Sequence, residues 1–224
     1  MEALPVLATF AFVLAIIALV VFLFVYQRKK ERERTQQLQM VASQLGWSFA
    51  VEAPLNMIAG LDQFVLFSHG HGKQIKNMMY GEASGMKAAV FDYIYVTGSG
   101  KNRTTHCQSV VYLEPGNLRL PYFSLRPESF LHKIFTAFGY QDIDFGQRPE
   151  FSKNYILRGQ DEPAIRQTFN DRLLFFYESQ PGTCTDGGGN QLLVFRNTCR
   201  FQPHEVQSQI ALALNLLNHF PRYE

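Results

Sequence analysis

The run TGSGKNRTT at residues 97–105 is the stretch that most suggests chemistry, because its Gly-Ser-Gly-Lys core is typical of phosphate-binding loops. Such a loop has a glycine five positions before its Gly-Lys pair, a Ser or Thr directly after the lysine, and a helix beyond. Those two positions hold Tyr95 and Asn102, and the following RTTHCQSVVYL alternates like a strand. We therefore interpret the run as a hairpin tip, where glycines supply the positive φ of a tight turn.

Asp92 is the carboxylate whose surroundings are most unusual. With the tip centred near Gly100, we expect Thr97 to pair with Arg103 and Asp92 to lie near Gln108. Apolar residues occupy both faces of this strand, so the carboxylate should be buried. A buried carboxylate must find hydrogen-bond partners or gain a proton. Asp92 is therefore either a satisfied structural group or a functional acid.

Histidines provide a second set of candidates. His69, His71, His106 and Cys107 would be metal ligands if the HGHG turn came close to the hairpin. The neighbouring glycines suit an exposed turn equally well, and His-x-His alone is a weak metal signature. We predict no metal, no cofactor and no catalytic residue.

Other reactive residue types are sparse. The three cysteines include no Cys-x-x-Cys pair, so neither a disulfide framework nor a zinc finger is expected. Asp142 and Asp144 in DIDF would share one face of an extended chain as a carboxylate pair. The alternative for this pair is a solvated loop beside a buried Ile143.

The N-terminal segment 4–26 is uncharged over 23 residues, LPVLATFAFVLAIIALVVFLFVY. About 20 apolar residues span a bilayer as a helix, and this segment has no polar stripe. A buried core helix rarely runs so long without charge. A cleavable signal peptide would need positive charge before the apolar run and small residues after it. We therefore predict a transmembrane helix.

Five basic residues follow this helix, and we predict that they contact the membrane surface: Arg28, Lys29, Lys30, Arg32 and Arg34. Positive flanks stay on the cytoplasmic side. We expect an inner (plasma) membrane protein with its N-terminus outside and its domain in the cytoplasm. Residues 1–34 hold five basic and three acidic side chains, and residues 35–224 hold sixteen of each. A neutral domain argues against nucleic-acid binding. The predicted partners are the lipid bilayer and an unidentified protein.

Periodicity predicts the elements that position these residues. Residues 31–46 form a helix, continuing or bending from the membrane helix. Alternation predicts an antiparallel meander and further strands. Pro121 suggests that its strand lies at a sheet edge. The predicted strands are 47–51, 63–67, 76–82, 86–96, 103–113, 118–125, 151–159, 183–185 and 191–196. Helices are predicted to begin near Pro127, Pro163 and Pro203, the first ending at Gly139.

The fold class that follows is α+β, an antiparallel sheet with amphipathic helices on one face, after one transmembrane helix. The domains are an anchor with its basic flank, 1–34, and a cytoplasmic domain, 35–224. An alternative division gives subdomains 47–140 and 141–224.

Several phrases of the sequence resemble an uncharacterised bacterial family: GLDQFVLFSHG, GMKAAVFDYIYVTGSGKNRTTHCQSVVYL, LRPESF, DIDF and PEFSKNYILRG. The resemblance covers most of the chain, and the hairpin phrase is its most distinctive part. It implies one N-terminal membrane helix, a single soluble domain and bacterial origin. No activity is established for the family, so the resemblance implies no site residue.

The function predicted from these features is a membrane-anchored binding module that is not an enzyme. Lys101 and Arg103, at the hairpin tip, are the predicted partner contacts. One alternative is a membrane-tethered enzyme that uses Asp92 with His106 or Arg103. Another is a lipid- or small-ligand-binding domain with a cavity lined by the many phenylalanines.

Overall fold

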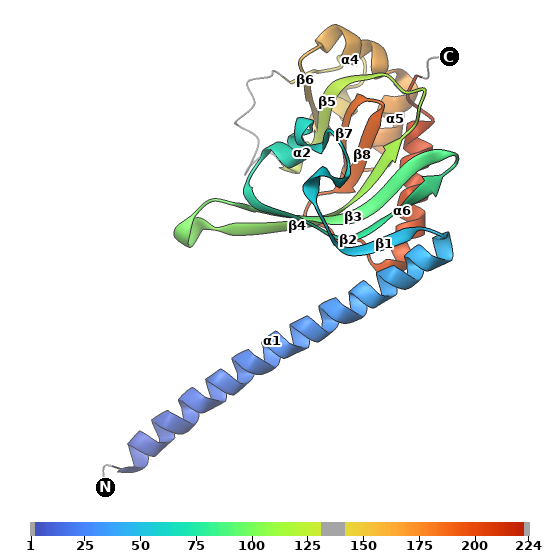
Figure 1. Ribbon diagram of the computed structural model, residues 1–224. Helices are drawn as coiled ribbons and strands as arrows, with labels where there is room; N and C mark the ends of the chain where they lie inside the picture. Colours follow the sequence, from blue (N-terminus) through green and yellow to red (C-terminus); the bar gives the residue numbers. More distant parts are fainter. Residues whose placement is uncertain (1–2, 131–141, 222–224) are drawn as a thin grey trace.

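One helix, α1 (Ala3–Leu45), forms the N-terminal part of the computed structural model, which describes residues 3–130 and 142–221. Its 43 residues include no glycine and one proline, Pro5, in the first turn, where a missing N–H breaks no helical hydrogen bond. The predicted segments 4–26 and 31–46 therefore belong to one uninterrupted helix (Figure 1).

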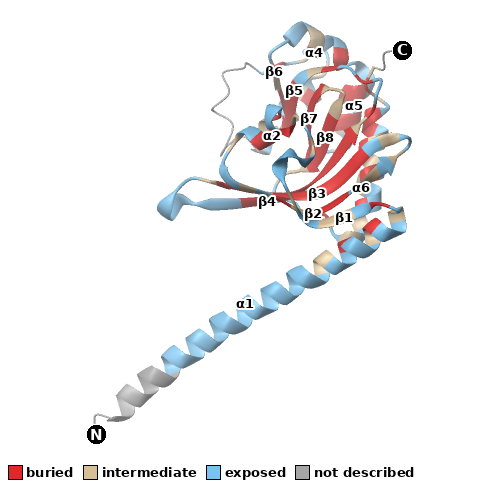
Figure 2. Ribbon diagram, in the orientation of Figure 1, coloured by how far each residue is buried: buried red, intermediate tan, exposed pale blue. Residues whose placement is uncertain are grey.

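Apolar side chains stand uncovered along the outer part of α1. The large hydrophobic side chains from Phe12 to Tyr26 are 46% to 68% exposed, and Figure 2 shows no other segment against them. This one stretch has the length and composition to cross a membrane. Burial begins at Leu38 and Ala42, which pack into the core of the domain. Gly46, with φ of +69°, ends the helix as predicted.

Eight strands form one antiparallel sheet in the order β1-β2-β3-β4-β8-β7-β5-β6 (Figure 1). Their bounds are β1 Ser48–Ala53, β2 His71–Ala83, β3 Met86–Thr97, β4 Thr104–Glu114, β5 Leu120–Pro127, β6 Tyr155–Gly159, β7 Thr183–Gly189 and β8 Gln191–Arg196. The first four strands make the predicted meander. The hairpin of β7 and β8 lies between β4 and β5, so strands from both 47–140 and 141–224 share one sheet.

The β3–β4 hairpin is one residue out of the predicted register. Thr97 pairs with Thr104 and Asp92 with Ser109, not with Arg103 and Gln108. The tip is longer than a tight turn because Gly100–Asn102 form a turn of 3-10 helix. The glycines at 98 and 100 have φ of +72° and +56°, as a glycine-rich tip requires.

The prediction that Pro121 marks an edge strand is wrong. Its strand, β5, is hydrogen-bonded to both β6 and β7. The pairing of β5 with β7 is irregular between Leu120 and Phe123, and its pairing with β6 begins only at Phe123. Pro121 therefore lies in an irregular stretch, where the lack of an N–H breaks no ladder bond.

Among the described residues, the helices longer than one turn cover one face of the sheet, together with the C-terminal end of α1 (Figure 1). They are α3 (Pro149–Asn154), α4 (Glu162–Thr168), α5 (Asp171–Ser179) and α6 (Val206–Leu217). Their apolar sides join a large cluster on this face. The predicted fold class, an antiparallel α+β sheet with helices on one face after a long apolar helix, is confirmed.

The opposite face is covered by the connection from β1 to β2. Leu61, Phe64, Leu66 and Phe67 from this connection pack on alternate residues of β3 and β4. Part of it is the short helix α2 (Val65–Ser68), so the strand predicted at 63–67 is wrong. The four-residue apolar run at 64–67 does not distinguish a buried strand from a buried helical turn.

Several other boundaries differ from the prediction, and β2 begins at His71, inside the predicted HGHG turn, and not at Lys76. The predicted strand 151–159 begins as α3, because Pro149 opens a helical turn, and only its second half is β6. The helix predicted from Pro163 is two helices, since Asn170 caps α5 separately. The last helix is preceded by a 3-10 turn, Pro203–Glu205. Most of the helix predicted from Pro127 to Gly139 lies outside the described residues, which show a 3-10 turn at Glu128–Phe130.

Candidate functional site

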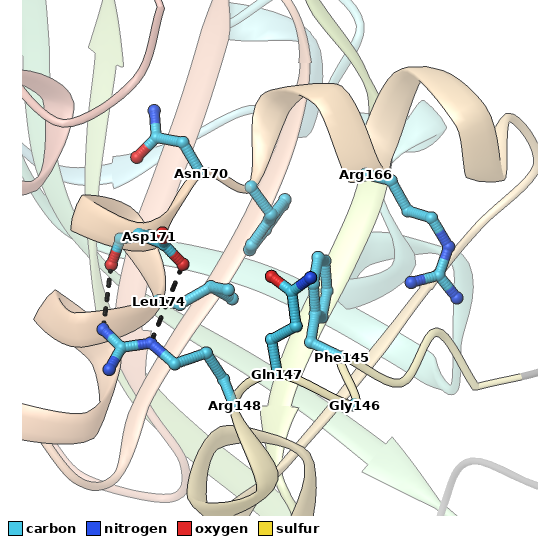
Figure 3. A pocket seen from close by; sticks show the side chains of 9 residues that line it. Phe145, Gly146, Gln147, Arg148, Arg166, Asn170, Asp171 and Leu174 are labelled. Atoms are coloured by element: carbon cyan, nitrogen blue, oxygen red, sulfur yellow. Dashed lines mark hydrogen bonds and ion pairs between the residues drawn. The ribbon is translucent and has the colours of Figure 1, made fainter.

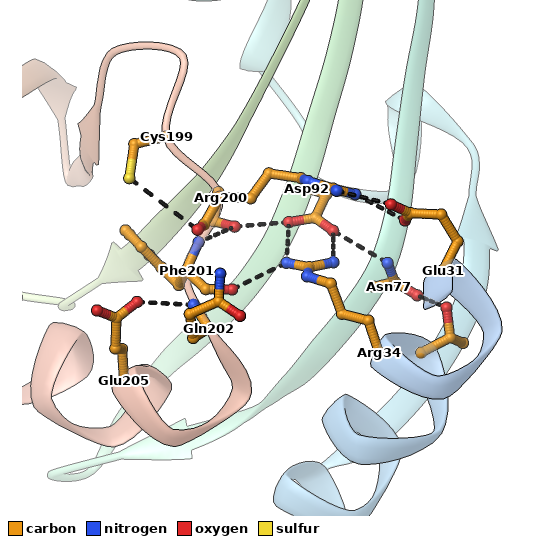
Figure 4. Close-up of polar contacts among 11 residues, drawn as sticks. Glu31, Arg34, Asn77, Asp92, Cys199, Arg200, Phe201, Gln202 and Glu205 are labelled. Atoms are coloured by element: carbon orange, nitrogen blue, oxygen red, sulfur yellow. Dashed lines mark hydrogen bonds and ion pairs between the residues drawn. The ribbon is translucent and has the colours of Figure 1, made fainter. Parts of the chain in front are cut away.

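The junction between α1 and the sheet is built around a buried ion pair. Arg34, on α1, donates from Nη1 to Oδ2 of Asp92 at 2.5 Å and from Nη2 to Oδ1 at 3.1 Å (Figure 4). The two side chains are only 10% and 4% exposed. A two-pronged arginine–carboxylate contact fixes orientation as well as distance. The helix is thereby held at a defined position on β3.

Two further side chains complete the surroundings of Asp92. Asn77 Nδ2 donates to Oδ2 at 3.0 Å, and Ser109 Oγ donates to Oδ1 at 2.5 Å. Asn77 has φ of +50° where the β2–β3 pairing shifts, and this bulge turns its amide toward the carboxylate. Its Oδ1 accepts from Thr35 Oγ1, so α1 is bound a second time. Asp92 is a satisfied structural group.

The segment after β8 closes the junction from the other side. The carbonyl of Phe201 accepts from Arg34 Nη2 at 3.0 Å, and its N–H donates to Ser109 Oγ. Beside it, the guanidinium of Arg200 makes two 2.7 Å hydrogen bonds to the carboxylate of Glu31 (Figure 4). These bonds raise the pKa of Arg200. We call Glu31, Arg34, Asn77, Asp92, Ser109, Arg200 and Phe201 the helix–sheet joint.

The enzyme arrangement considered from the sequence is not formed. The hollow beside Asp92 has a volume of about 10 Å³, room for about one water molecule and not for a substrate. His106 pairs with Tyr95, three residues from Asp92 along β3, so the two side chains point to opposite faces of the sheet. Arg103 is exposed at the hairpin tip. Asp92 therefore meets neither proposed catalytic partner.

His106 has a structural setting of its own. Its ring stacks on Tyr95 at 4.7 Å between centroids, and Nε2 is hydrogen-bonded to Thr97 Oγ1 at 2.7 Å. Burial lowers the pKa of His106 below its ordinary value. The neutral ring thus braces the outer part of the hairpin.

The basic flank divides into two parts. Arg28, Lys29, Lys30 and Arg32 are exposed, with Arg28 stacked over Phe24 at 4.3 Å. Membrane contact remains a prediction for these four. Arg34 does not fit that prediction, because its guanidinium is buried on Asp92. Arg34 was grouped with the flank because it follows the other basic residues in the sequence, but its side chain faces the sheet.

The remaining candidates stay apart. Lys101 and Arg103 are exposed at the tip, and partner contact remains a prediction for them. Among the residues that the structure describes, no three His, Cys, Asp or Glu side chains gather as a metal site. Asp142 is drawn into the fold, since its Oδ1 accepts from the Leu157 N–H at 2.9 Å. Burial raises the pKa of Asp142.

The structure contains a second buried ion pair that was not predicted from the sequence. Arg126 on β5 and Asp186 on β7 lie 2.7 Å apart, with side chains 5% and 0% exposed. Asp186 Oδ2 accepts from the Leu66 N–H at 3.0 Å, which fastens α2 to the sheet. Burial of Arg126 by itself lowers the pKa of its guanidinium. The negative charge of Asp186 favours the protonated form, and the net effect raises the pKa of Arg126. An arginine and an aspartate 60 positions apart give no sequence signal of their pairing.

An open groove of about 490 Å³ lies beside α4 and α5 (Figure 3). These helices are at the other end of the sheet from α1 (Figure 1). We call it the arginine groove, and its lining residues are Phe145, Gly146, Gln147, Arg148, Arg166, Phe169, Asn170, Asp171 and Leu174. Arg166 is held by Glu162, and Arg148 lies 3.6 Å from Glu178. Phe175 stands 61% exposed near Arg148, whose guanidinium is 5.8 Å from the ring centre.

Together, the fold and the joint define an α+β domain held firmly on one long apolar helix. No protein-family model and no curated protein matches the chain. A solved structure, the mycobacterial trehalose monomycolate transport factor A, TtfA, matches with a TM-score of 0.60 over 86% of this chain and 99% of that chain. Their sequences are 13% identical, so the likeness shows a shared fold and by itself carries no function.

Proposed function

We propose that this chain is a single-pass membrane protein whose cytoplasmic domain, 35–224, is a binding module of a membrane assembly. Residues 1–34 form the anchor and its flank, with the N-terminus outside. The exposed apolar stretch of α1 supports the anchor, and the positive flank supports the orientation.

The helix–sheet joint is the observation that carries the proposal. A flexible linker after a membrane anchor would leave the domain free to rotate. Here the helix runs uninterrupted into the domain and is fixed there by the buried pair of Arg34 and Asp92. Such coupling fixes the rotation of the domain about the axis of α1. Fixed orientation suits contact with another membrane component.

The arginine groove supplies the contact surface of the module in this proposal. Arginine and aromatic side chains contribute most to protein–protein affinity. Arg148, which lines the groove, and Phe175 beside it combine these types on a part of the domain far from α1. The solved structure that shares this fold is a transport factor. By this proposal the chain has an accessory role in a transport assembly.

Helical insertions test whether orientation matters. Each residue turns an α-helix by about 100°, so two residues inserted after Lys29 rotate the domain by about 200° about α1. Seven residues rotate it by about 700°, within about 20° of full turns, and raise it by about 10 Å. A photo-crosslinking amino acid at Phe175 reports partner contact in native membranes, with Asn117 as the control position.

We expect one discrete adduct from position 175 and none from position 117. The adduct should be lost with the two-residue insertion and retained with the seven-residue insertion. Equal adducts in both insertion variants would contradict an orientation-dependent module. Alkaline phosphatase fused after Glu224 tests topology separately, because it is active only outside the cytoplasm, and strong activity would refute the inside assignment.

A further inference from the structure

The outer end of α1 and the tip of the β3–β4 hairpin extend to the same side of the domain (Figure 1). The contacts along α1 establish this direction. Arg34 of α1 contacts Asp92 of β3. One turn closer to the C-terminus of α1, Leu38 lines the same hollow as Val90, which is farther from the hairpin tip than Asp92. Going toward the N-terminus along α1 therefore means going toward the hairpin tip along β3.

Helix and strand rises place the tip at the height of the basic flank. From Arg34 to Tyr26, eight helical residues advance by about 12 Å. From Asp92 to Thr97, five strand residues advance by about 16 Å, and the tip lies beyond. The hairpin is inclined to α1 (Figure 1), so only part of the strand distance counts along the direction of the helix. The tip thus reaches the level at which the apolar stretch of α1 ends.

The composition of the hairpin's outer half suits a negatively charged surface. No acidic residue occurs from Tyr93 to Leu113, whereas Lys101 and Arg103 are both present. Every residue from 98 to 105 is exposed. None of these is a large apolar residue, so the tip is built to lie among headgroups and not to insert into the hydrocarbon.

We propose that the hairpin tip is a second membrane contact, in which Lys101 and Arg103 bind anionic phospholipid headgroups. The proposal rests on the membrane anchoring proposed above and adds a partner to it. One helix alone leaves a domain free to tilt, and a second contact off the helix axis fixes the tilt. The tip, by this assignment, binds lipid and not a protein.

Depth measurement in nanodiscs tests the proposal with the full-length chain. Cys199→Ser removes the exposed thiol, while Cys184 is buried and Cys107 half-buried. A fluorophore is then attached at Ser99→Cys in the tip, at Asn117→Cys in the exposed loop after β4, or at Val25→Cys in α1. Lipids that carry a nitroxide near the headgroup quench a fluorophore that lies at their depth. The bilayers are phosphatidylcholine alone or phosphatidylcholine with phosphatidylglycerol.

In the anionic bilayer we expect quenching at Ser99 to exceed that at Asn117 by at least about twofold, because basic residues are held at anionic surfaces. Quenching at Ser99 should fall to the neutral-bilayer level in the Lys101→Gln/Arg103→Gln variant. The matched control is Lys87→Gln, which removes an exposed charge at the other end of the hairpin and should leave quenching unchanged.

The Val25 label separates the two proposals. If Val25 is quenched and Ser99 is no more quenched than Asn117, the tip proposal is overturned while the anchor stands. If Val25 is not quenched, the anchor is refuted, and the tip proposal falls with it.

Discussion

Arg34 of α1 and Asp92 of β3 are 58 positions apart in the chain, and their side chains form a two-pronged ion pair inside the protein. The outer part of this helix is exposed, and the centre of this sheet is buried. The ion pair joins the two elements. It makes the anchor and the domain one mechanical unit. The consequences can be measured without knowing the partner.

Removing the arginine should destabilise the domain strongly. Arg34→Ala leaves the Asp92 charge buried without its cation, which typically costs about 3–5 kcal/mol. For a chain of this size the loss corresponds to a fall in Tm on the order of 10 °C. Thermal unfolding of the full-length protein in detergent, followed by tryptophan fluorescence, measures it. Arg32→Ala, which removes an exposed arginine of the same helix, should change stability by no more than about 0.5 kcal/mol.

The double variant Arg34→Met/Asp92→Leu makes the interpretation sharper. It removes both charges and keeps side-chain volume, so it should be more stable than Arg34→Ala. A double variant as unstable as Arg34→Ala would mean that packing, and not the uncompensated charge, dominates at the joint.

The sequence predicted the basic flank and the buried Asp92 but not the contact between Arg34 and Asp92. An uncharged segment and alternating strands have local signatures, so the anchor and the meander were foreseeable. Asp92 was foreseeable as a buried carboxylate in need of partners. Its partner was not, because Arg34 follows four exposed basic residues and shares their apparent role. Only the packing of α1 on the sheet shows that its side chain faces inward.

The errors on the fold also have physical causes. Residues 64–67 are all apolar because this part of the connection packs against the sheet, and such a short run has no period to identify. Pro121 lies in an irregular stretch of an inner strand, where the usual rule for edges does not apply. The pairing of Arg126 with Asp186 depends on β5 lying beside β7, which no local pattern specifies.

The three cysteines should differ in reactivity. Cys199 is exposed, whereas burial raises the pKa of Cys107 and of Cys184 to about 11. Because the thiolate is the reactive form, half-buried Cys107 and buried Cys184 should react slowly at pH 8. Titration with a disulfide reagent should give one fast equivalent in the folded protein and three after denaturation. Cys199→Ser should abolish the fast phase, and a fast phase that persists would contradict the burial of the other two.

Burial of His106 should make stability depend on pH. Its pKa is lowered in the folded protein, so between the folded and unfolded values the unfolded chain binds more protons. The contribution of the neutral ring is therefore complete above about pH 6.5 and is lost as the pH falls below it.

The variant His106→Phe isolates this contribution, because phenylalanine can still stack on Tyr95 but does not titrate. The Tm of the wild type should fall relative to that of the variant between pH 7.5 and pH 5.5. His69, whose pKa burial also lowers, titrates in both proteins and cancels in the comparison. Parallel pH profiles for the two proteins would show that His106 does not contribute.

Trp47, the one tryptophan of the chain, offers a direct optical test of the packing where α1 meets the sheet. Its Nε1 donates to the Glu82 carbonyl at 3.0 Å, and its ring lies over Gly81. A Cβ at position 81 would lie 2.5 Å from the indole, which is closer than packed carbon atoms approach. Gly81→Ala should therefore displace the ring from its place over β2.

We expect Gly81→Ala to shift the emission of Trp47 to longer wavelength, because the displaced ring meets water. The overpacking should lower stability by about 1–3 kcal/mol. Gly116→Ala is the matched control, since nothing lies within 4 Å of a Cβ at that position, and it should leave both emission and Tm unchanged. Unshifted emission in Gly81→Ala would mean that the backbone of β2 yields instead of the indole, and that Trp47 does not fix the end of α1 to the sheet.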